Sequence, residues 1–248
     1  MALLSMAMPF TAKAQDKVEA SAGVDLVSGY VWRGQDLGGV SLQPSASIAY
    51  KGFSLGAWGS VGIESSDTKE FDLILGYSTG GFSVSVTDYW YNVTGDGVTA
   101  KYFQYGAHNA ANSHLFEAQI GYDFGPVAVN WYTNFAGDDG VDKDGDRAYS
   151  SYISVAAPFT LGGLDWTAEI GATPWATDFY GANGFAAFPV LTYQHFTVLS
   201  IDRKQSFAAL RAFLVGQVIV AEGLCACLDL TDQFFGIIAD FFNKCFFL

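Results

Sequence analysis

Residues 71–86 read FDLILGYSTGGFSVSV, and the spacing of their apolar side chains decides the fold class. On both sides of the turn at residues 79–81, every second residue is large and apolar, whereas the residues between them are mostly small or polar. This period of two places the two sets on opposite faces of a β-hairpin. In a secreted β-sandwich the apolar face would be the core. In an outer-membrane barrel it would face lipid, and the polar face would line the interior.

Alternation of the same kind recurs from Val24 to Gly171, and the first predicted strand begins at Val24 and runs through Tyr30 and Trp32. The runs are about 9–11 residues long, which is the length that a tilted strand needs to cross a bilayer, whereas strands of globular proteins average about 5–6 residues. About ten strands can be identified, and about twelve are expected because bacterial outer-membrane barrels are closed and have even strand numbers. The sequence therefore predicts an all-β fold, an antiparallel transmembrane β-barrel over residues 15–187.

The connections between these runs alternate in length. The short ones lie at residues 51–52, 79–81, 125–126 and 158–163, and the longer, polar ones at residues 34–39, 64–69, 92–113, 136–146 and 174–183. Outer-membrane barrels have short periplasmic turns and long outer loops, whereas a sandwich gives no reason for such alternation. Aromatic residues, among them Tyr30 and Trp32, also gather near the strand ends, as in the aromatic girdles of these barrels.

Two terminal segments fall outside the predicted barrel. Residues 1–14 contain an apolar run before an A-x-A motif at residues 12–14, which is typical of a secretory signal peptide, here without its positively charged beginning. Residues 188–248 lose the alternation, and residues 207–224 form a nearly continuous apolar run. We expect this tail to be either a frameshifted reading of the gene or a genuine helical extension.

Composition restricts the partners of the chain. Only 15% of its residues are charged and its net charge is −13, whereas soluble domains carry about 25% charged residues. Lys and Arg form no cluster in the sequence, which argues against a nucleic-acid partner. The expected partners are outer-membrane lipid and lipopolysaccharide, the barrel-assembly machinery, and small solutes or cations. No cofactor is expected.

Two stretches carry a resemblance to a known family. Residues 24–39 read VDLVSGYVWRGQDLGG, and residues 161–175 read LGGLDWTAEIGATPW. With these and with further stretches between residues 52 and 140, the chain resembles the TorF-like porin family of Gram-negative bacteria over roughly residues 18–187. The YVWRG element is the most specific part. The resemblance implies a barrel in the bacterial outer membrane with a role in transport, and the tail after residue 187 departs from the family pattern.

Charged residues on the polar face are the candidates for lining the interior. They are Asp25, Arg33, Asp72, Glu117, Asp123, Asp165 and Glu169. If the interior is open, this acid-rich lining favours cations, whereas in a narrow barrel salt bridges and water would fill the space. The predicted function is passive passage of small solutes or ions. The alternatives are a closed structural or surface-recognition barrel, acting through the loops at residues 92–113 and 136–146, and a lipid-modifying enzyme.

One loop has the beginning of a calcium-binding pattern. Asp142, Asp144 and Asp146 follow the 1, 3, 5 spacing of such a loop. Arg147 and Ile153, however, stand where a Gly and a bidentate Glu are required. The sequence therefore gives only a weak indication of a metal site, and the alternative is an acidic surface loop.

Catalytic signals are sparse. The histidines are His108, His114 and His195. Ser113 precedes His114 directly, and neighbours on a strand point to opposite faces, so the two make a poor nucleophile and base. The sequence contains no nucleophile elbow, metal-ligand spacing or phosphate loop. We therefore predict no catalytic residues.

Overall fold

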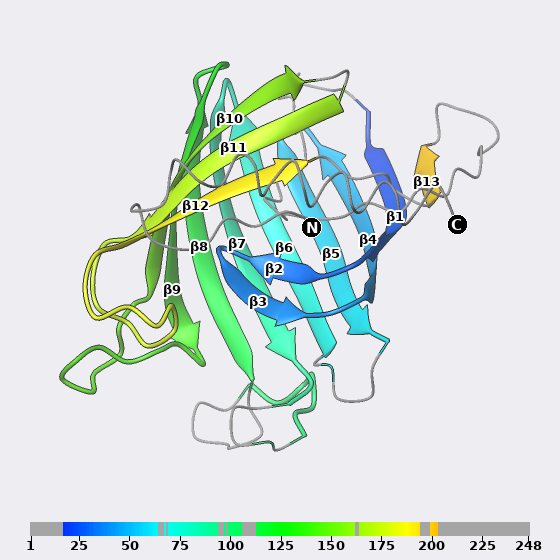
Figure 1. Cartoon of the computed structure of the whole chain (residues 1–248). Coiled ribbons are helices and arrows are strands. Elements are labelled where there is room, and N and C mark those ends of the chain that lie inside the picture. Colours follow the sequence, from blue (N-terminus) through cyan, green and yellow to red (C-terminus); the bar gives the residue numbers. More distant parts are fainter. Residues whose placement is uncertain are drawn as a thin grey trace, which may run out of the picture.

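The computed structural model describes residues 17–63, 67, 69–93, 97, 99–105, 113–161, 164–193 and 199–202. Over these residues the fold is all-β. One antiparallel sheet of eleven strands has the order β12-β11-β10-β9-β8-β7-β6-β5-β4-β1-β13, and β2 and β3 form a separate two-stranded ribbon (Figure 1). The predicted signal peptide at residues 1–14 and most of the predicted tail lie outside the described residues.

The strands follow the sequence in a meander in which neighbours along the chain pair with each other. Their bounds are β1 Glu19–Val27, β2 Tyr30–Trp32, β3 Gln35–Gly38, β4 Ser41–Tyr50, β5 Phe53–Gly62, β6 Lys69–Thr79, β7 Phe82–Tyr91, β8 His114–Asp123, β9 Ala128–Gly137, β10 Ser151–Leu161, β11 Leu164–Thr173, β12 Ala186–Tyr193 and β13 Leu199–Asp202. The eight strands from β4 to β11 have 10 or 11 residues each, which confirms the predicted strand length. From β4 to β12, short turns and longer connections alternate as predicted.

The large sheet has two edges in the described part of the chain. They are β12 and β13, and no hydrogen-bonded pairing joins them there, so a closed barrel is not detected over these residues. β12 continues the sheet to Tyr193, beyond the boundary predicted at residues 187 and 188. No helix capable of traversing a lipid bilayer occurs within the described ranges. The confirmed part of the fold prediction is the all-β class with a large antiparallel sheet.

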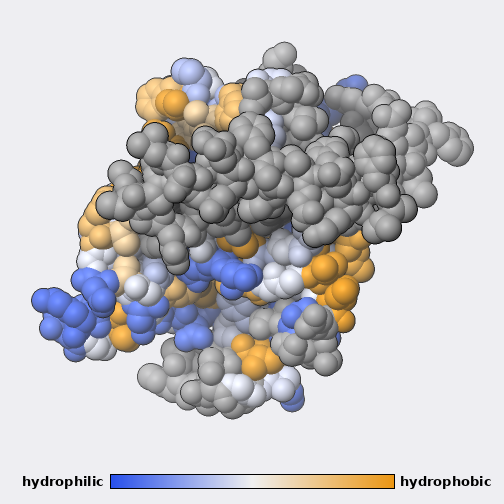
Figure 2. All heavy atoms as spheres, viewed as in Figure 1, coloured by the Kyte–Doolittle hydropathy of each residue, from blue (hydrophilic) through white to orange (hydrophobic). Residues whose placement is uncertain are grey.

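The two faces of the sheet have opposite chemistry. In residues 71–86, Asp72 and Ser78 are buried on one face, whereas Leu73 and Leu75 are exposed on the other. The contrast extends across the sheet, since Gln43 is 0% exposed whereas Ile170 is 64% exposed. Figure 2 shows hydrophobic residues along the outer flanks and hydrophilic residues in the hollow between them. The polar face is therefore the enclosed one, and the apolar face is directed outward.

The first predicted strand is wrong in its second half. It was expected to run through Tyr30 and Trp32, with an outer loop at residues 34–39. Instead β1 ends at Val27, and β2 and β3 form a hairpin on the concave side of the sheet (Figure 1). The turn of this hairpin consists of Arg33 and Gly34, with φ angles of 49° and 81°. Positive φ at both central residues is what a two-residue hairpin turn of the favoured hand requires.

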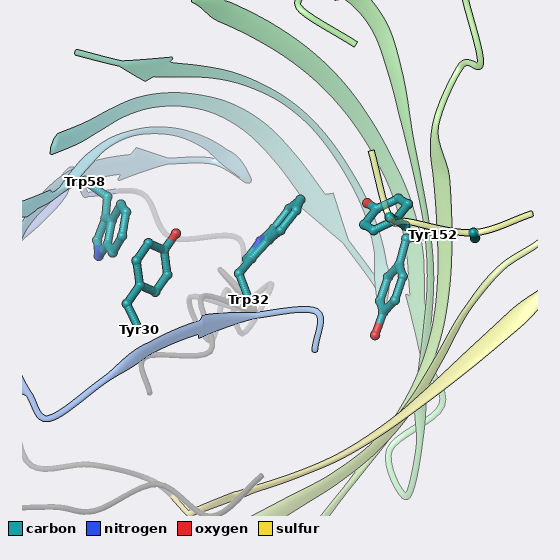
Figure 3. Packing of buried hydrophobic residues seen from close by; sticks show 6 residues of the cluster. Tyr30, Trp32, Trp58 and Tyr152 are labelled. Atoms are coloured by element: carbon teal, nitrogen blue, oxygen red, sulfur yellow. The ribbon is translucent and has the colours of Figure 1, made fainter. Parts of the chain in front are cut away.

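The side chains of β2 fill the interior. Tyr30 and Trp32 rise from this strand into the space between Trp58 on one wall and Tyr152 on the other (Figure 3). The Tyr30 and Trp58 rings lie 5.5 Å apart between centroids. Tyr30 and Trp32 therefore belong to the core of the molecule and not to an outer aromatic girdle.

The turn of the inward hairpin is the first point to test. Gly34→Ala places a Cβ on a residue with φ 81°, and such a left-handed conformation costs a non-glycine residue about 1–2 kcal/mol. We expect the free energy of unfolding to fall by about this amount. The matched control is Gly39→Ala, because Gly39 has ordinary φ and open space around it. Urea unfolding of the folded protein measures both variants, and equal effects would contradict the positive φ of Gly34 in this turn.

The buried arginine site inside the sheet

Arg33 lies at the tip of the inward hairpin and is 5% exposed. Its guanidinium donates to both carboxylate oxygens of Glu117 on β8: Nη1 to Oε2, and Nη2 to Oε1 at 2.9 Å. Nη1 also donates to the hydroxyl of Tyr180 at 2.7 Å. A planar guanidinium that meets a carboxylate through two parallel hydrogen bonds forms one of the strongest side-chain pairs in proteins. The pair fixes the hairpin tip against the sheet wall.

Aromatic rings surround the same guanidinium. Arg33 Cζ lies 4.2 Å from the ring centroid of Trp32, 4.0 Å from that of Tyr132 and 4.9 Å from that of Tyr152. A cation over the face of such rings is attracted by their quadrupoles, more strongly when water is excluded. We call the group that surrounds the guanidinium the Arg33 seat, which consists of Trp32, Glu117, Tyr132, Tyr152 and Tyr180.

Two hydrogen bonds and one glycine support the Arg33 seat. Tyr89 donates to Glu117 Oε1 at 3.0 Å, and Tyr152 donates to Glu169 Oε1 at 3.1 Å. A Cβ at Gly171 would lie 1.6 Å from the Tyr152 hydroxyl oxygen. A glycine at this position therefore gives the Tyr152 ring the room that it occupies against the wall.

Electrostatics keep the guanidinium charged. Burial alone would lower the pKa of Arg33, but the adjacent Glu117 carboxylate, Tyr180 and Tyr89 together outweigh this effect and raise the pKa well above its ordinary value. Burial also raises the pKa of the Tyr180 hydroxyl, so that it stays protonated. Removing one member of a buried ion pair leaves an uncompensated charge and typically costs about 3–5 kcal/mol. Arg33 and Glu117 therefore stabilise each other through their opposite charges as well as through their two hydrogen bonds.

The interior around this pair has an excess of carboxylates. Among the described residues, Arg33 is the only Lys or Arg that is buried. Four carboxylates, those of Glu70, Asp72, Glu117 and Glu169, are buried there as well. Asp72 Oδ1 has no hydrogen-bond partner in the described part of the chain. Glu70 accepts hydrogen bonds from two tyrosine hydroxyls, and the Glu70 and Glu117 charges act on Asp72. Such an environment attracts a cation and repels an anion.

The residues predicted to line the interior differ in their burial. Arg33, Asp72, Glu117 and Glu169 are buried together in the concave space. Asp25 is half-buried on β1, opposite Gln43 of β4. Asp123 is exposed at the turn after β8, where its Oδ1 accepts a hydrogen bond from the Gly125 amide at 2.7 Å. Asp165 lies on β11, and its side chain is not among those described.

The predicted calcium loop uses one carboxylate to close its own turn. Asp142 Oδ1 accepts hydrogen bonds from the amides of Asp144 at 2.9 Å and Asp146 at 3.0 Å. Within the ranges that the structure describes, no three His, Cys, Asp or Glu side chains are grouped as metal ligands. The three Asp side chains are therefore not gathered around a common point in this conformation.

A pair formed by a histidine and an aspartate on the outward face was not predicted. His114 is fully buried, and its Nδ1 lies 2.7 Å from Asp88 Oδ1. Its Nε2 contacts the carbonyl oxygen of Tyr102, and the Tyr105 ring stacks on it at 4.1 Å. The neighbouring Ser113 hydroxyl donates to the Tyr91 carbonyl. Ser113 and His114 thus engage different partners on different faces.

The sequence indicated the Arg33 seat only in part. Parity along the strands placed Arg33 and Glu117 on the interior side, but it could not pair them across 84 residues of sequence. Tyr180 comes from the connection between β11 and β12, which was predicted as an outer loop. Its ring stacks on Trp32 at 6.1 Å, so part of this connection also folds inward.

Comparisons with known proteins place the chain in a family. The model of a bacterial family described as "Bacterial protein of unknown function (Gcw_chp)" matches residues 11–182. The chain belongs to this family. A search of curated proteins and a search of solved structures each give no match. The description of Gcw_chp assigns no function, so the resemblance to TorF-like porins stays a prediction. The matched range contains Arg33 and its whole seat.

Proposed function

We propose that this Gcw_chp protein is a β-barrel of the bacterial outer membrane whose acid-lined interior passes small cations and is closed at rest by the β2–β3 hairpin. The observation that carries the proposal is the inverted sheet, with its polar face enclosed and its apolar face exposed. Leu75 on β6 is 60% exposed and Ile170 on β11 is 64% exposed. A contiguous apolar surface of this extent marks contact with another molecule or with lipid. Apolar-out, polar-in alternation over strands of this length is typical of membrane barrels.

Closure of the sheet is part of this proposal. In lipid, unpaired backbone groups cost several kcal/mol each, so the edges of a membrane sheet must be paired. The edges of the described sheet are β12 and β13. The proposal therefore requires that these edges be joined in the membrane. An antiparallel meander is the strand order from which such barrels close.

The hairpin determines the resting state. The Arg33 seat closes around the guanidinium from β2, β8, β9 and β10 and from the connection after β11. Buried carboxylates on the same face favour cations, as rings of Asp and Glu do in cation channels. Solutes can pass this level only when Arg33 leaves Glu117. The proposed pore is therefore gated by one ion pair.

A second candidate function is recognition at the loop end of the molecule. A cavity of about 310 Å³ lies between the long connections. It is lined by Tyr91, Ser113, Leu115, Asp138, Asp139, Gly140, Asp178 and Phe179. Several of these groups already hold the loops together, since Asp178 Oδ1 accepts the Val141 amide at 2.6 Å. This cavity supports a closed barrel that binds a ligand at its surface, if the interior never opens.

Contact of the outward face with lipid is tested by Leu75→Lys. A lysine at the lipid-facing midpoint of a barrel strand costs about 2–4 kcal/mol, because the charge must leave water. We expect this loss in the free energy of unfolding when the protein is folded into lipid vesicles and unfolded with urea. The control is Val141→Lys in an exposed loop, where a surface change stays within about 0.5 kcal/mol. An equally small effect at Leu75 would argue against the membrane.

Gating by the hairpin is tested by planar-bilayer recording of the wild type and of Arg33→Asn. Asparagine tolerates positive φ, so this variant keeps the turn and removes the guanidinium. We expect rare openings in the wild type and frequent, cation-selective openings in the variant, since an open acidic lumen favours cations. If neither protein conducts, the pore is refuted and the recognition barrel is favoured. If both conduct equally, the hairpin does not close the interior.

A further inference from the structure

We propose that the Arg33 seat is a binding site for small cations that carry a guanidinium group, and that Arg33 occupies it as a built-in competing ligand. The inference rests on the proposed function and names the class of solute that the interior selects. It is carried by the geometry around the guanidinium: a bidentate carboxylate, three ring faces and a hydroxyl oxygen. All of these contacts are made by the guanidinium of Arg33 and none by its backbone.

Each contact would be available to a free guanidinium. The Glu117 carboxylate matches the two parallel N–H groups of any guanidino compound. The rings of Trp32, Tyr132 and Tyr152 would face the planar cation at the 4.0–4.9 Å distances that Arg33 now has. The Tyr180 hydroxyl would accept a further N–H. An ammonium ion would keep the charge but lose the planar two-point match, so the site prefers guanidinium over amine.

The backbone at the tip of the hairpin favours exchange. Arg33 has φ 49°, a conformation that non-glycine residues other than Asn and Asp seldom adopt. Such strain persists where the surroundings impose it, commonly at ligand clamps and switches. Here the side-chain contacts of Arg33 offset the strain. A free guanidinium would make the same contacts without this cost, which helps it to displace the tethered one.

The charges beside the seat point to the same class of ligand. Asp72 is 2% exposed, and its Oδ1 has no hydrogen-bond partner among the described residues. Glu169, next to the seat, is engaged by the Tyr152 hydroxyl. With Arg33 withdrawn, the buried carboxylates would face one another without a buried Lys or Arg in the described part of the chain. A cation that enters as Arg33 leaves removes this repulsion.

Tethering determines what each protein should bind. A group on the same chain has a high effective concentration at its site, of millimolar order for flexible tethers, so wild-type protein should bind a free guanidino compound weakly. Arg33→Asn vacates the seat and keeps a residue that tolerates the turn. In this variant, Glu117 and the rings would be open to a ligand from solution.

The experiment measures methylguanidinium binding to the folded full-length protein by calorimetry and by thermal stability, at concentrations well below those that denature. We expect saturable binding and stabilisation of Arg33→Asn. Binding should be at least about tenfold weaker for wild type and for Arg33→Asn with Glu117→Gln, since one charged hydrogen-bonded contact contributes about 1.5–3 kcal/mol. Methylammonium and sodium chloride at equal ionic strength control for general salt effects.

Two outcomes would overturn the inference. One is the absence of saturable binding to Arg33→Asn, and the other is equal binding when Glu117→Gln is added, which would leave Arg33 as a structural contact only. If Arg33→Asn folds poorly, the refolding yield with and without methylguanidinium replaces calorimetry, and it should rise for this variant and not for the double variant. Binding is measured without conductance, so failure of the pore and failure of the site give different results.

Discussion

A charged guanidinium in the middle of the molecule constrains everything around it. Arg33 is buried, and two of its three guanidinium nitrogens donate to Glu117, so the hairpin that carries it must reach the wall at β8. Reaching the wall requires a tight turn with positive φ at Arg33 and Gly34. It also requires β1 to end at Val27, because a strand continuing along the sheet would keep Arg33 in the wall beside β4 and away from Glu117 on β8. One ion pair thus determines where the first strand ends and what fills the concave space.

The interior that receives this pair is mainly polar and aromatic, with few buried aliphatic side chains such as Ile74 and Leu115. Its ring cluster joins Tyr30, Trp32, Trp58, Tyr152 and Tyr180. Near the short turns of the sheet, hydrogen bonds between polar side chains fill the interior in place of aromatic rings. Gln119 donates to Ser83 at 3.0 Å and to Asn130 at 2.9 Å. Buried polar groups are tolerated when they are hydrogen-bonded, so this interior can be largely polar while most of the large aliphatic side chains of the sheet lie on the outside. The apolar outer face and the polar interior are therefore two consequences of one arrangement.

The alternation in the sequence was sufficient to predict the walls. Period two identifies both faces of β6 and β7, and the turn residues give the ends of the strands. It failed at Tyr30 and Trp32, because their parity continues that of Val24 and Leu26 across Ser28 and Gly29. A short inward hairpin and an outer loop have the same local signal, since both need a glycine-containing turn. The decision between them depends on Glu117, which is 84 residues away from Arg33.

The candidate site was predicted as a set of charges but not as a site. Parity placed Asp72, Glu117 and Glu169 on the inner face, and the structure buries all three. Their partners could not be read from spacing, because Tyr132 and Tyr152 also look like ordinary strand aromatics. Tyr180 lies in a connection, where no periodicity specifies direction. The chemistry of the site therefore emerges only when the sheet curls and brings distant strands together.

A double-mutant cycle between Arg33 and Glu117 measures directly whether the two side chains stabilise each other. Arg33→Asn, Glu117→Gln and the combined variant are folded into the same vesicles, and the free energy of unfolding is measured for each. We expect the combined loss to be smaller than the sum of the single losses by at least about 1.5 kcal/mol, as for close buried charge pairs. Additivity within about 0.5 kcal/mol, the value for independent sites, would show that the guanidinium and the carboxylate do not meet inside the sheet.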